Sequence, residues 1–114
     1  MQIIGIDPGL RKTGWGIVSV EGNIITHVSN GTLKSSESND LSQRLLEIFV
    51  QLIKVIEDFK PQVAAVENTF INKDAAGALK LGQARAIALL APAKLKLPVF
   101  EYAPNTIKKA VVGV

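Results

Sequence analysis

The chain has no cysteine and a single histidine among its 114 residues. The absence of cysteine excludes disulfides, thiolate catalysis and cysteine-ligated zinc. One histidine, His27, leaves no multi-histidine metal site, and its position in an expected surface strand argues against Ser-His-Asp chemistry. Any bound metal is therefore expected to have oxygen ligands, which favours magnesium or manganese.

Long apolar runs are also missing. Hydrophobic residues make up 47% of the chain and charged residues 20%, but no run approaches the length of a membrane span. The N-terminus lacks the basic stretch and apolar core of a signal peptide. These features predict a soluble, cytoplasmic protein without a membrane partner, and 114 residues suit a single domain spanning residues 1–114.

The charges are unevenly distributed along the chain. Residues 1–67 contain 6 Lys and Arg against 8 Asp and Glu, whereas residues 68–114 contain 7 against 2. A basic second part following an acidic first part favours a polyanionic ligand. For any single lysine, an ordinary solvated surface position is the simpler interpretation.

The pattern of apolar runs and turn residues predicts an α/β fold. Strands are expected at residues 2–7, 15–20, 24–33, 63–67 and 98–102. Helices are expected after Asp40, from about residue 75 to 91, and from residue 104 to about 112. This order predicts a mixed sheet in which an antiparallel meander is followed by strands that helical crossovers connect.

The helix boundaries have recognisable signals. Asp40 with Gln43 is a candidate capping box, and Asp74 is a candidate cap for the second long helix, which Pro92 is expected to end. In the first helix, an apolar stripe is expected to face the sheet. It consists of Leu41, Leu45, Phe49, Leu52, Ile53 and Ile56.

The second long helix contains two glycines, Gly77 and Gly82. Because glycine destabilises a helix by about 1 kcal/mol relative to alanine, both suggest close approach by another helix or a ligand. Simple packing of a small-residue face on the sheet is the alternative.

Two acidic residues end short apolar strands. Asp7 follows Gln2-Ile3-Ile4-Gly5-Ile6, and Glu67 follows Val63-Ala64-Ala65-Val66. A carboxylate beside such a core loses hydration, which is costly unless a cation or strong donors compensate. If the two strands are neighbours, their separation of about 4.8 Å brings both acids within reach of one divalent ion. The alternative is that each acid is a strand-end charge facing water.

The segment from Ile4 to Gly16 reads Ile-Gly-Ile-Asp-Pro-Gly-Leu-Arg-Lys-Thr-Gly-Trp-Gly. Gly9, Gly14 and Gly16 are expected to leave room for a backbone or phosphate near Asp7. An Asp-x-Gly between two strands occurs in ribonuclease H-like nucleases and also in the phosphate loop of the actin, Hsp70 and sugar-kinase group.

Three later segments favour the nucleases. They are Val-Glu-Asn-Thr-Phe at 66–70, Ala-Leu-Lys-Leu-Gly-Gln-Ala-Arg at 78–85 and Tyr-Ala-Pro-Asn-Thr-Ile-Lys-Lys-Ala-Val-Val-Gly at 102–113. Together with the Asp7 segment they resemble the RuvC family of crossover-junction endodeoxyribonucleases over the whole chain. The resemblance implies a ribonuclease H-like fold, a homodimer, cooperation with the RuvA-RuvB branch-migration complex, and Mg²⁺-dependent nicking of four-way (Holliday) DNA junctions in recombination and repair.

The resemblance also implies roles for particular residues. Asp7 and Glu67 are expected to bind catalytic metal, Mg²⁺ or Mn²⁺, with two ions in a complete site. Lys108 is expected to face DNA near the scissile phosphate and to assist catalysis. Phe70 is expected to stack on a base at the junction, although a core aromatic is the alternative. Further candidate DNA contacts, which rest mostly on charge, are Lys73, Lys80, Arg85 and Lys109.

Members of this family continue beyond the position of Val114 with a basic segment and a final helix that bears two more metal-binding acids. The resemblance therefore implies a C-terminally truncated domain without its final helix. Neither Asp74, a candidate helix cap, nor Glu101, within a strand, is a convincing substitute ligand. We accordingly expect weak Mg²⁺ binding and slow or absent cleavage by this 114-residue form.

Three other functions fit parts of the pattern. One is a module that binds junction DNA without cutting it. Another is a ribonuclease H-like nuclease acting on a different nucleic acid, such as an RNA–DNA hybrid. The third is an ATP-dependent kinase or chaperone-like domain that uses the Asp7 loop for phosphate, but 114 residues cannot supply the second lobe that it needs.

Overall fold

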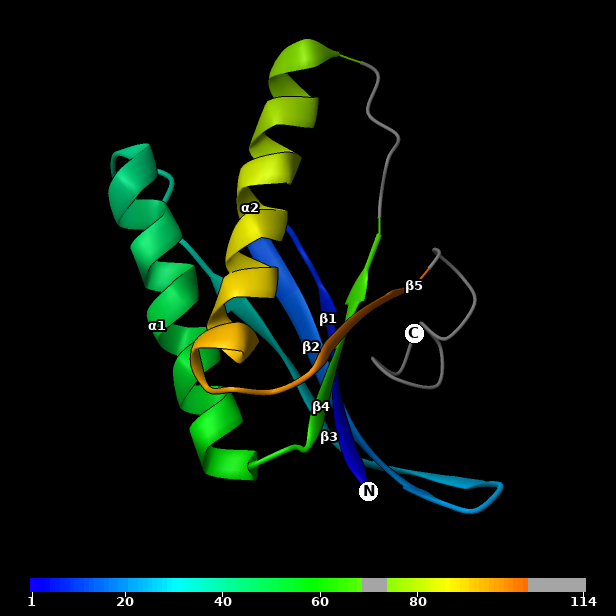
Figure 1. Cartoon of the computed structure of the whole chain (residues 1–114). Coiled ribbons are helices and arrows are strands. Elements are labelled where there is room, and N and C mark those ends of the chain that lie inside the picture. The colour runs from blue at the N-terminus through cyan, green and yellow to red at the C-terminus, as the bar shows by residue number, and fades with distance from the viewer. Residues whose placement is uncertain (69–73, 103–114) are drawn as a thin grey trace.

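The computed structural model describes residues 1–68 and 74–102, which form one five-stranded sheet and two helices (Figure 1). The elements in chain order are β1 (Gln2–Asp7), β2 (Lys12–Glu21), β3 (Ile24–Lys34), α1 (Leu41–Phe59), β4 (Val63–Glu67), α2 (Ala75–Lys94) and β5 (Val99–Tyr102). The expected third helix, from residue 104, lies outside the described residues.

The sheet has the strand order β3-β2-β1-β4-β5. The strands β1, β2 and β3 form an antiparallel meander, and Gly22 occupies the tight turn between β2 and β3 with φ +61°. Through the crossovers of α1 and α2, β4 and β5 run parallel to β1. The predicted mixed sheet is therefore confirmed, and β1 and β4 are neighbours.

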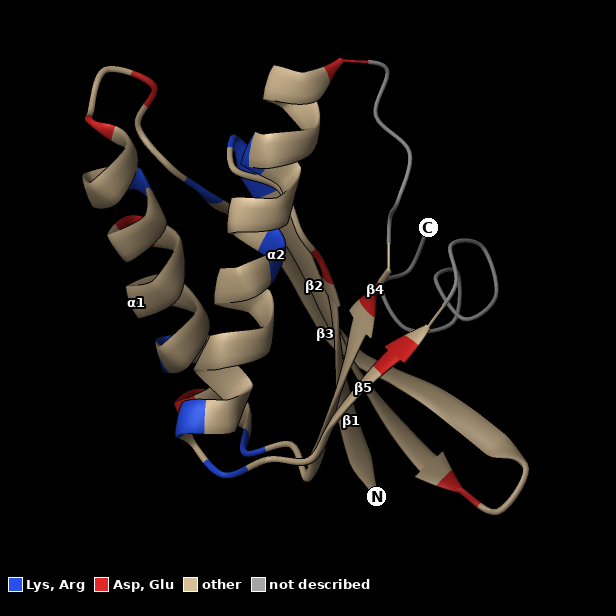
Figure 2. Ribbon diagram, turned by 45° about the horizontal axis from the view of Figure 1, so that its top comes forward, with Lys and Arg blue, Asp and Glu red and all other residues tan. Residues whose placement is uncertain are grey.

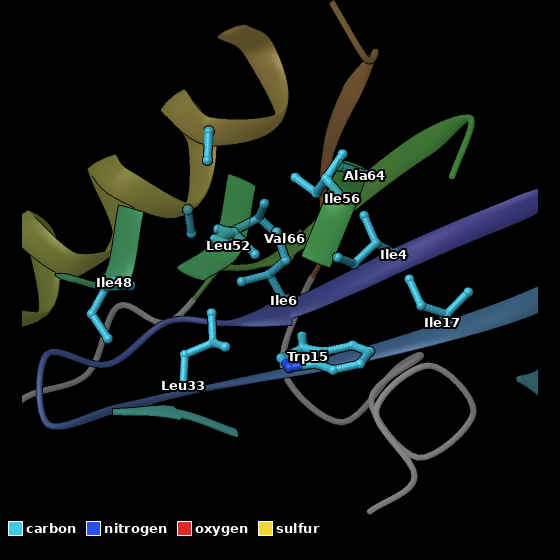
Figure 3. Packing of buried hydrophobic residues seen from close by; sticks show 12 residues of the cluster. Ile4, Ile6, Trp15, Ile17, Leu33, Ile48, Leu52, Ile56, Ala64 and Val66 are labelled. Carbon is cyan, nitrogen blue, oxygen red and sulfur yellow. The ribbon is translucent and has the colours of Figure 1, made fainter. Parts of the chain in front are cut away.

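Both helices pack on the same face of the sheet, where they enclose the hydrophobic core (Figures 1 and 3). The core residues that the strands and helices contribute are Ile4, Ile6, Trp15, Ile17, Leu33, Ile48, Leu52, Ile56, Ala64, Val66, Ala88 and Ala91. Side chains alternate between the faces of a strand. Because Ile4 and Ile6 face the helices, Asp7 belongs to the opposite face.

The start of α1 differs from the sequence prediction. Asp40 is the residue before the helix, but its side chain forms no capping hydrogen bond, so the predicted capping box is wrong. Glu47 instead holds the preceding loop, since its carboxylate accepts hydrogen bonds from the Ser36 backbone N–H at 2.9 Å and the Asn39 side chain at 2.7 Å. Leu41 is exposed, and the fully buried residues of the helix are Ile48, Leu52 and Ile56.

In α2, the predicted cap is confirmed and the predicted end is wrong. The Asp74 carboxylate accepts a hydrogen bond from the Gly77 backbone N–H at 2.6 Å. Pro92 lies inside the helix, which continues to Lys94. Proline lacks an N–H and interrupts helical hydrogen bonding, and here it does so only in the last turn.

The glycine at position 82 does not have the predicted packing role. A Cβ on Gly82 would have no neighbouring atom within 4 Å. A close approach is found instead at Gly31 in β3, where a Cβ would lie 2.9 Å from Cζ2 of Trp15. Gly31 therefore makes room for the Trp15 indole, whose ring lies 5.5 Å from that of Phe59 between centroids.

None of the helices in the described part of the chain is long and apolar enough to span a membrane.

Candidate active site at the carboxyl edge of the sheet

Asp7 and Glu67 lie side by side at the ends of two parallel strands. The register of β1 and β4 pairs Ile6 with Val66, and the two acids are the next residues of their strands. Neighbouring strands lie about 4.8 Å apart. Both acids follow a residue of the helix-covered core, so alternation directs both toward the opposite face of the sheet. The predicted pairing of the two acids at one sheet edge is confirmed.

Glu67 is buried, and burying a charged carboxylate is energetically costly unless other groups compensate. Only 3% of Glu67 is exposed, whereas Asp7 is partly exposed. A buried carboxylate loses much of its hydration, and a second carboxylate on the next strand adds repulsion. Figure 2 shows the acidic segment at the end of β4. Such an arrangement is typical of a functional site.

Tyr102 is a third member of the site, which the sequence prediction missed. It ends β5, pairs in register with Glu67, and is only 8% exposed. The pKa of its phenol is raised above the ordinary value, first by burial, then by the charge of Glu67 and then by that of Asp7. The phenol is therefore next to Glu67 on the neighbouring strand and within electrostatic range of Asp7. The available signal was the position of Tyr102 at the end of a third parallel strand.

The donor atoms around this edge suit a hard cation. Asp7 and Glu67 supply carboxylate oxygens, which magnesium and manganese prefer. The side-chain oxygen of Asn68, next to Glu67, is buried and has no hydrogen-bond partner among the described residues. Within residues 1–68 and 74–102, however, no three His, Cys, Asp or Glu side chains gather closely enough to hold a metal ion. The described part of the site thus fits a divalent ion with two carboxylates.

The turn between β1 and β2 is held rigidly beside Asp7. The Thr13 hydroxyl donates to the Gly9 carbonyl at 2.7 Å, and the Gly9 N–H donates to the Thr13 Oγ1 at 3.2 Å. A Cβ on Gly9 would lie 2.2 Å from the Lys12 carbonyl oxygen, so the turn itself requires this glycine. A Cβ on Gly14 would lie 3.7 Å from the Asp7 Cβ, so Gly14 does border the carboxylate.

Arg85 and Glu101 form an ion pair between α2 and β5. Glu101 pairs in register with Val66, on the face that the helices cover, and therefore points away from Asp7 and Glu67. Arg85 is thus engaged by a carboxylate of its own chain, and its predicted contact with DNA stays a prediction.

Of the other predicted site residues, Lys80 is exposed on α2. Four lie outside the described residues, and their roles stay predictions: Phe70, Lys73, Lys108 and Lys109.

The sequence profile of the family described as "Crossover junction endodeoxyribonuclease RuvC" matches residues 3–114. The chain belongs to the RuvC family. Among similar curated proteins, the crossover junction endodeoxyribonuclease RuvC of Bartonella henselae is 58% identical over 114 residues, which are 100% of this chain and 68% of that protein. The corresponding protein of Brucella ovis is 59% identical over 100% of this chain and 66% of its own length. The chain therefore spans about two thirds of the length of these RuvC relatives.

Solved RuvC structures have the same architecture. A Thermus thermophilus RuvC in complex with Holliday junction substrate superposes with a TM-score of 0.86 at 30% identity, covering 100% of this chain and 70% of the other. A second Thermus thermophilus RuvC structure gives a TM-score of 0.81 at 31% identity, covering 96% and 68%. The predicted ribonuclease H-like fold is confirmed, and the predicted class, a hydrolytic junction endonuclease, is confirmed at the level of the family. The kinase and chaperone alternative is excluded by this membership.

Proposed function

We propose that this chain belongs to an endonuclease that nicks four-way DNA junctions by metal-dependent phosphodiester hydrolysis. The observation that carries the proposal is the meeting of Asp7 and Glu67 on one face at the ends of neighbouring strands, with Tyr102 close to both. Membership of the RuvC family and the likeness to a RuvC bound to junction DNA support the substrate.

In this proposal, Asp7 and Glu67 hold Mg²⁺, or Mn²⁺, and the complete site holds two ions. Divalent ions held there would supply a water of lowered pKa for attack and positive charge against the phosphate and the leaving oxygen. The contribution of this chain is to fix two anionic oxygens at a rigid sheet edge. Burial of Glu67 and Tyr102 restricts water there, which would strengthen the attraction between a bound cation and a phosphodiester.

Tyr102 is suited to remain a neutral hydrogen-bond donor in this site. Its raised pKa keeps the phenol protonated at every pH at which the enzyme is expected to work. A neutral hydroxyl beside two carboxylates adds no further negative charge where a phosphate must approach. The roles proposed for Lys108 as a catalytic cation, for Phe70 as a base-stacking residue, and for Lys73, Lys80, Arg85 and Lys109 as phosphate contacts follow from the resemblance and from charge.

The decisive experiment is incubation of a synthetic four-way junction with Mg²⁺ and the protein. Asp7→Asn and Glu67→Gln remove the charges but preserve the shapes. Each is expected to lower, by at least about a hundredfold, the slow cleavage expected of this 114-residue form. The matched control is Glu101→Gln, an acid on β5 that lies on the other face and is expected to have little effect on cleavage. Unchanged cleavage by Asp7→Asn would contradict the proposed metal site.

A second candidate function is junction binding without cleavage. It is favoured by the finding that the described residues bring together two carboxylates rather than three or more. Junctions that shift in a gel but stay uncut with Mg²⁺ or Mn²⁺ would support it. Cleavage of an RNA–DNA hybrid in preference to a junction would instead support the ribonuclease H-like alternative.

A homodimer and cooperation with the RuvA-RuvB branch-migration complex remain part of the proposal, as does a cytoplasmic location. An exposed stripe of apolar and small residues along one face of α2, made of Leu79, Gly82, Ala86 and Leu90, supports self-association. Light scattering measures the oligomer directly, and Leu79→Lys with Leu90→Lys is expected to shift it toward the monomer.

A further inference from the structure

A row of basic residues extends the carboxyl edge of the sheet beyond Asp7. Asp7 pairs with Gly14 of β2, and Lys12, two residues further out, pairs with Lys34 of β3. Alternation places Lys12 and Lys34 on the same face as Gly14 and Asp7. From strand spacing and rise, the Cα atoms of Lys12 and Asp7 are about 8 Å apart. Measured along the axis of a B-DNA duplex, at a rise of about 3.4 Å per nucleotide, this span corresponds to two to three nucleotides of one strand.

These lysines line a cavity of about 470 Å³. The lining consists of Arg11, Lys12, Lys34, Ser35 and Glu37, which together bring three cations and one anion to a single hollow. Like charges directly opposite each other on neighbouring strands are destabilising. The register pairs Lys12 with Lys34 in that way, so an anion bound between them would relieve a local repulsion.

Ser35, one residue of the cavity lining, is fixed by hydrogen bonds. The Ser35 hydroxyl donates to the Leu10 carbonyl at 2.6 Å and accepts from the Arg44 Nε at 3.0 Å, and the Ser35 N–H donates to the Arg11 carbonyl at 3.3 Å. Ser35 is itself buried. These hydrogen bonds join the β1–β2 turn to the end of β3, and Arg44 of α1 helps to hold Ser35 in place.

We propose that this cavity binds a backbone phosphate of the DNA strand that passes the carboxylates, two to three nucleotides from the phosphate at Asp7 and Glu67. The inference rests on the proposed function, because it places one strand across both sites. Lys12 and Lys34 would contact the phosphate from adjacent strands. Arg11 is already paired with Glu37, because the Arg11 Nε and the Glu37 Oε1 lie 3.0 Å apart. Lys12 and Lys34 are therefore the main cations for the phosphate.

The test compares two double variants that lose the same charge. Lys12→Gln with Lys34→Gln empties the cavity of its lysines, whereas Lys54→Gln with Lys94→Gln removes exposed lysines of the helices. Junction binding is measured by fluorescence anisotropy in EDTA, from about 50 to 200 mM salt. Each lost phosphate contact lowers the slope of log affinity against log salt by about 0.9. The cavity variant, which loses one phosphate contact, is expected to lose about tenfold in affinity and about one unit of slope. The control is expected to lose less than twofold in affinity.

A second measurement separates failure of this inference from failure of the proposed function. Inorganic phosphate is titrated into the unsubstituted protein, and the backbone amide signals of Lys12, Lys34 and Ser35 are expected to shift, but not in the cavity variant. If the protein binds junctions and both double variants bind equally with equal slopes, the cavity inference is overturned. If the protein binds no junction, the proposed function fails, and the phosphate titration alone decides whether the cavity is an anion site.

Discussion

Tyr102 offers a direct test of the site because it is the only tyrosine in the chain, so tyrosinate absorbance reports on one group. Burial, Glu67 and Asp7 all raise its pKa above the ordinary value near 10. The folded protein therefore keeps this proton at pH values at which the unfolded chain releases it. Because the folded state then holds more protons, the contribution of Tyr102 to stability is constant below about pH 10 and falls above it.

The size of the loss follows from linkage. While the folded pKa stays above the pH, each pH unit above 10 lowers the free energy of unfolding by about 1.4 kcal/mol through this group. Urea unfolding at about pH 8 and about pH 11 measures the change, and Tyr102→Phe isolates the part that the phenol contributes. We expect Tyr102→Phe to have similar stability to the unsubstituted chain at pH 8, since the hydroxyl has no hydrogen-bond partner among the described residues. At pH 11 it should be more stable by about 1 kcal/mol.

Two charge variants test the geometry. Glu67→Gln removes a cause of the raised pKa and should let tyrosinate form at lower pH. Glu101→Gln is the control, because Glu101 adjoins Tyr102 in sequence but pairs with Arg85 on the opposite face. A native tyrosine that titrates at its ordinary pKa, or an equal response to both variants, would refute the clustering of Tyr102 with the two carboxylates.

Three further predictions concern the cavity and two glycines. Glu37→Gln frees Arg11 from its ion pair and should tighten junction binding at low salt. At high salt the difference should be small, because screening is strong there. Weaker binding of this variant in the anisotropy assay would contradict the anion site. Gly31→Ala puts a Cβ against the Trp15 ring and should destabilise the fold by about 1–3 kcal/mol in urea unfolding, unless the ring has room to move. Gly82→Ala meets no atom within 4 Å and should stabilise α2 by up to about 1 kcal/mol in the same assay; a loss of stability would reveal a contact at this position.

Much of the fold was predictable because its signals are local. A short apolar run bounded by turn residues identifies a strand such as β4, and an apolar residue every third or fourth position identifies α1. The capping of α2 by Asp74 is equally local, since it involves atoms three residues apart. The prediction that Pro92 ends α2 was wrong because Pro92 lies in the last turn of the helix. A proline there interrupts the hydrogen bonding of the last turn only, whereas one in the middle of the helix would kink or break it.

The sequence by itself determined that two acids end interior strands, because Asp7 and Glu67 each follow a short apolar run that is bounded by turn residues. Only the tertiary structure decided which side chains join them. Tyr102 reaches Glu67, and Lys12 faces Lys34, through pairing between strands, and register is set by contacts far apart in the chain. Gly31 likewise shows its role only when Trp15 is placed against it. Local sequence patterns predict the two acids of the site, and strand pairing decides which other side chains lie beside them.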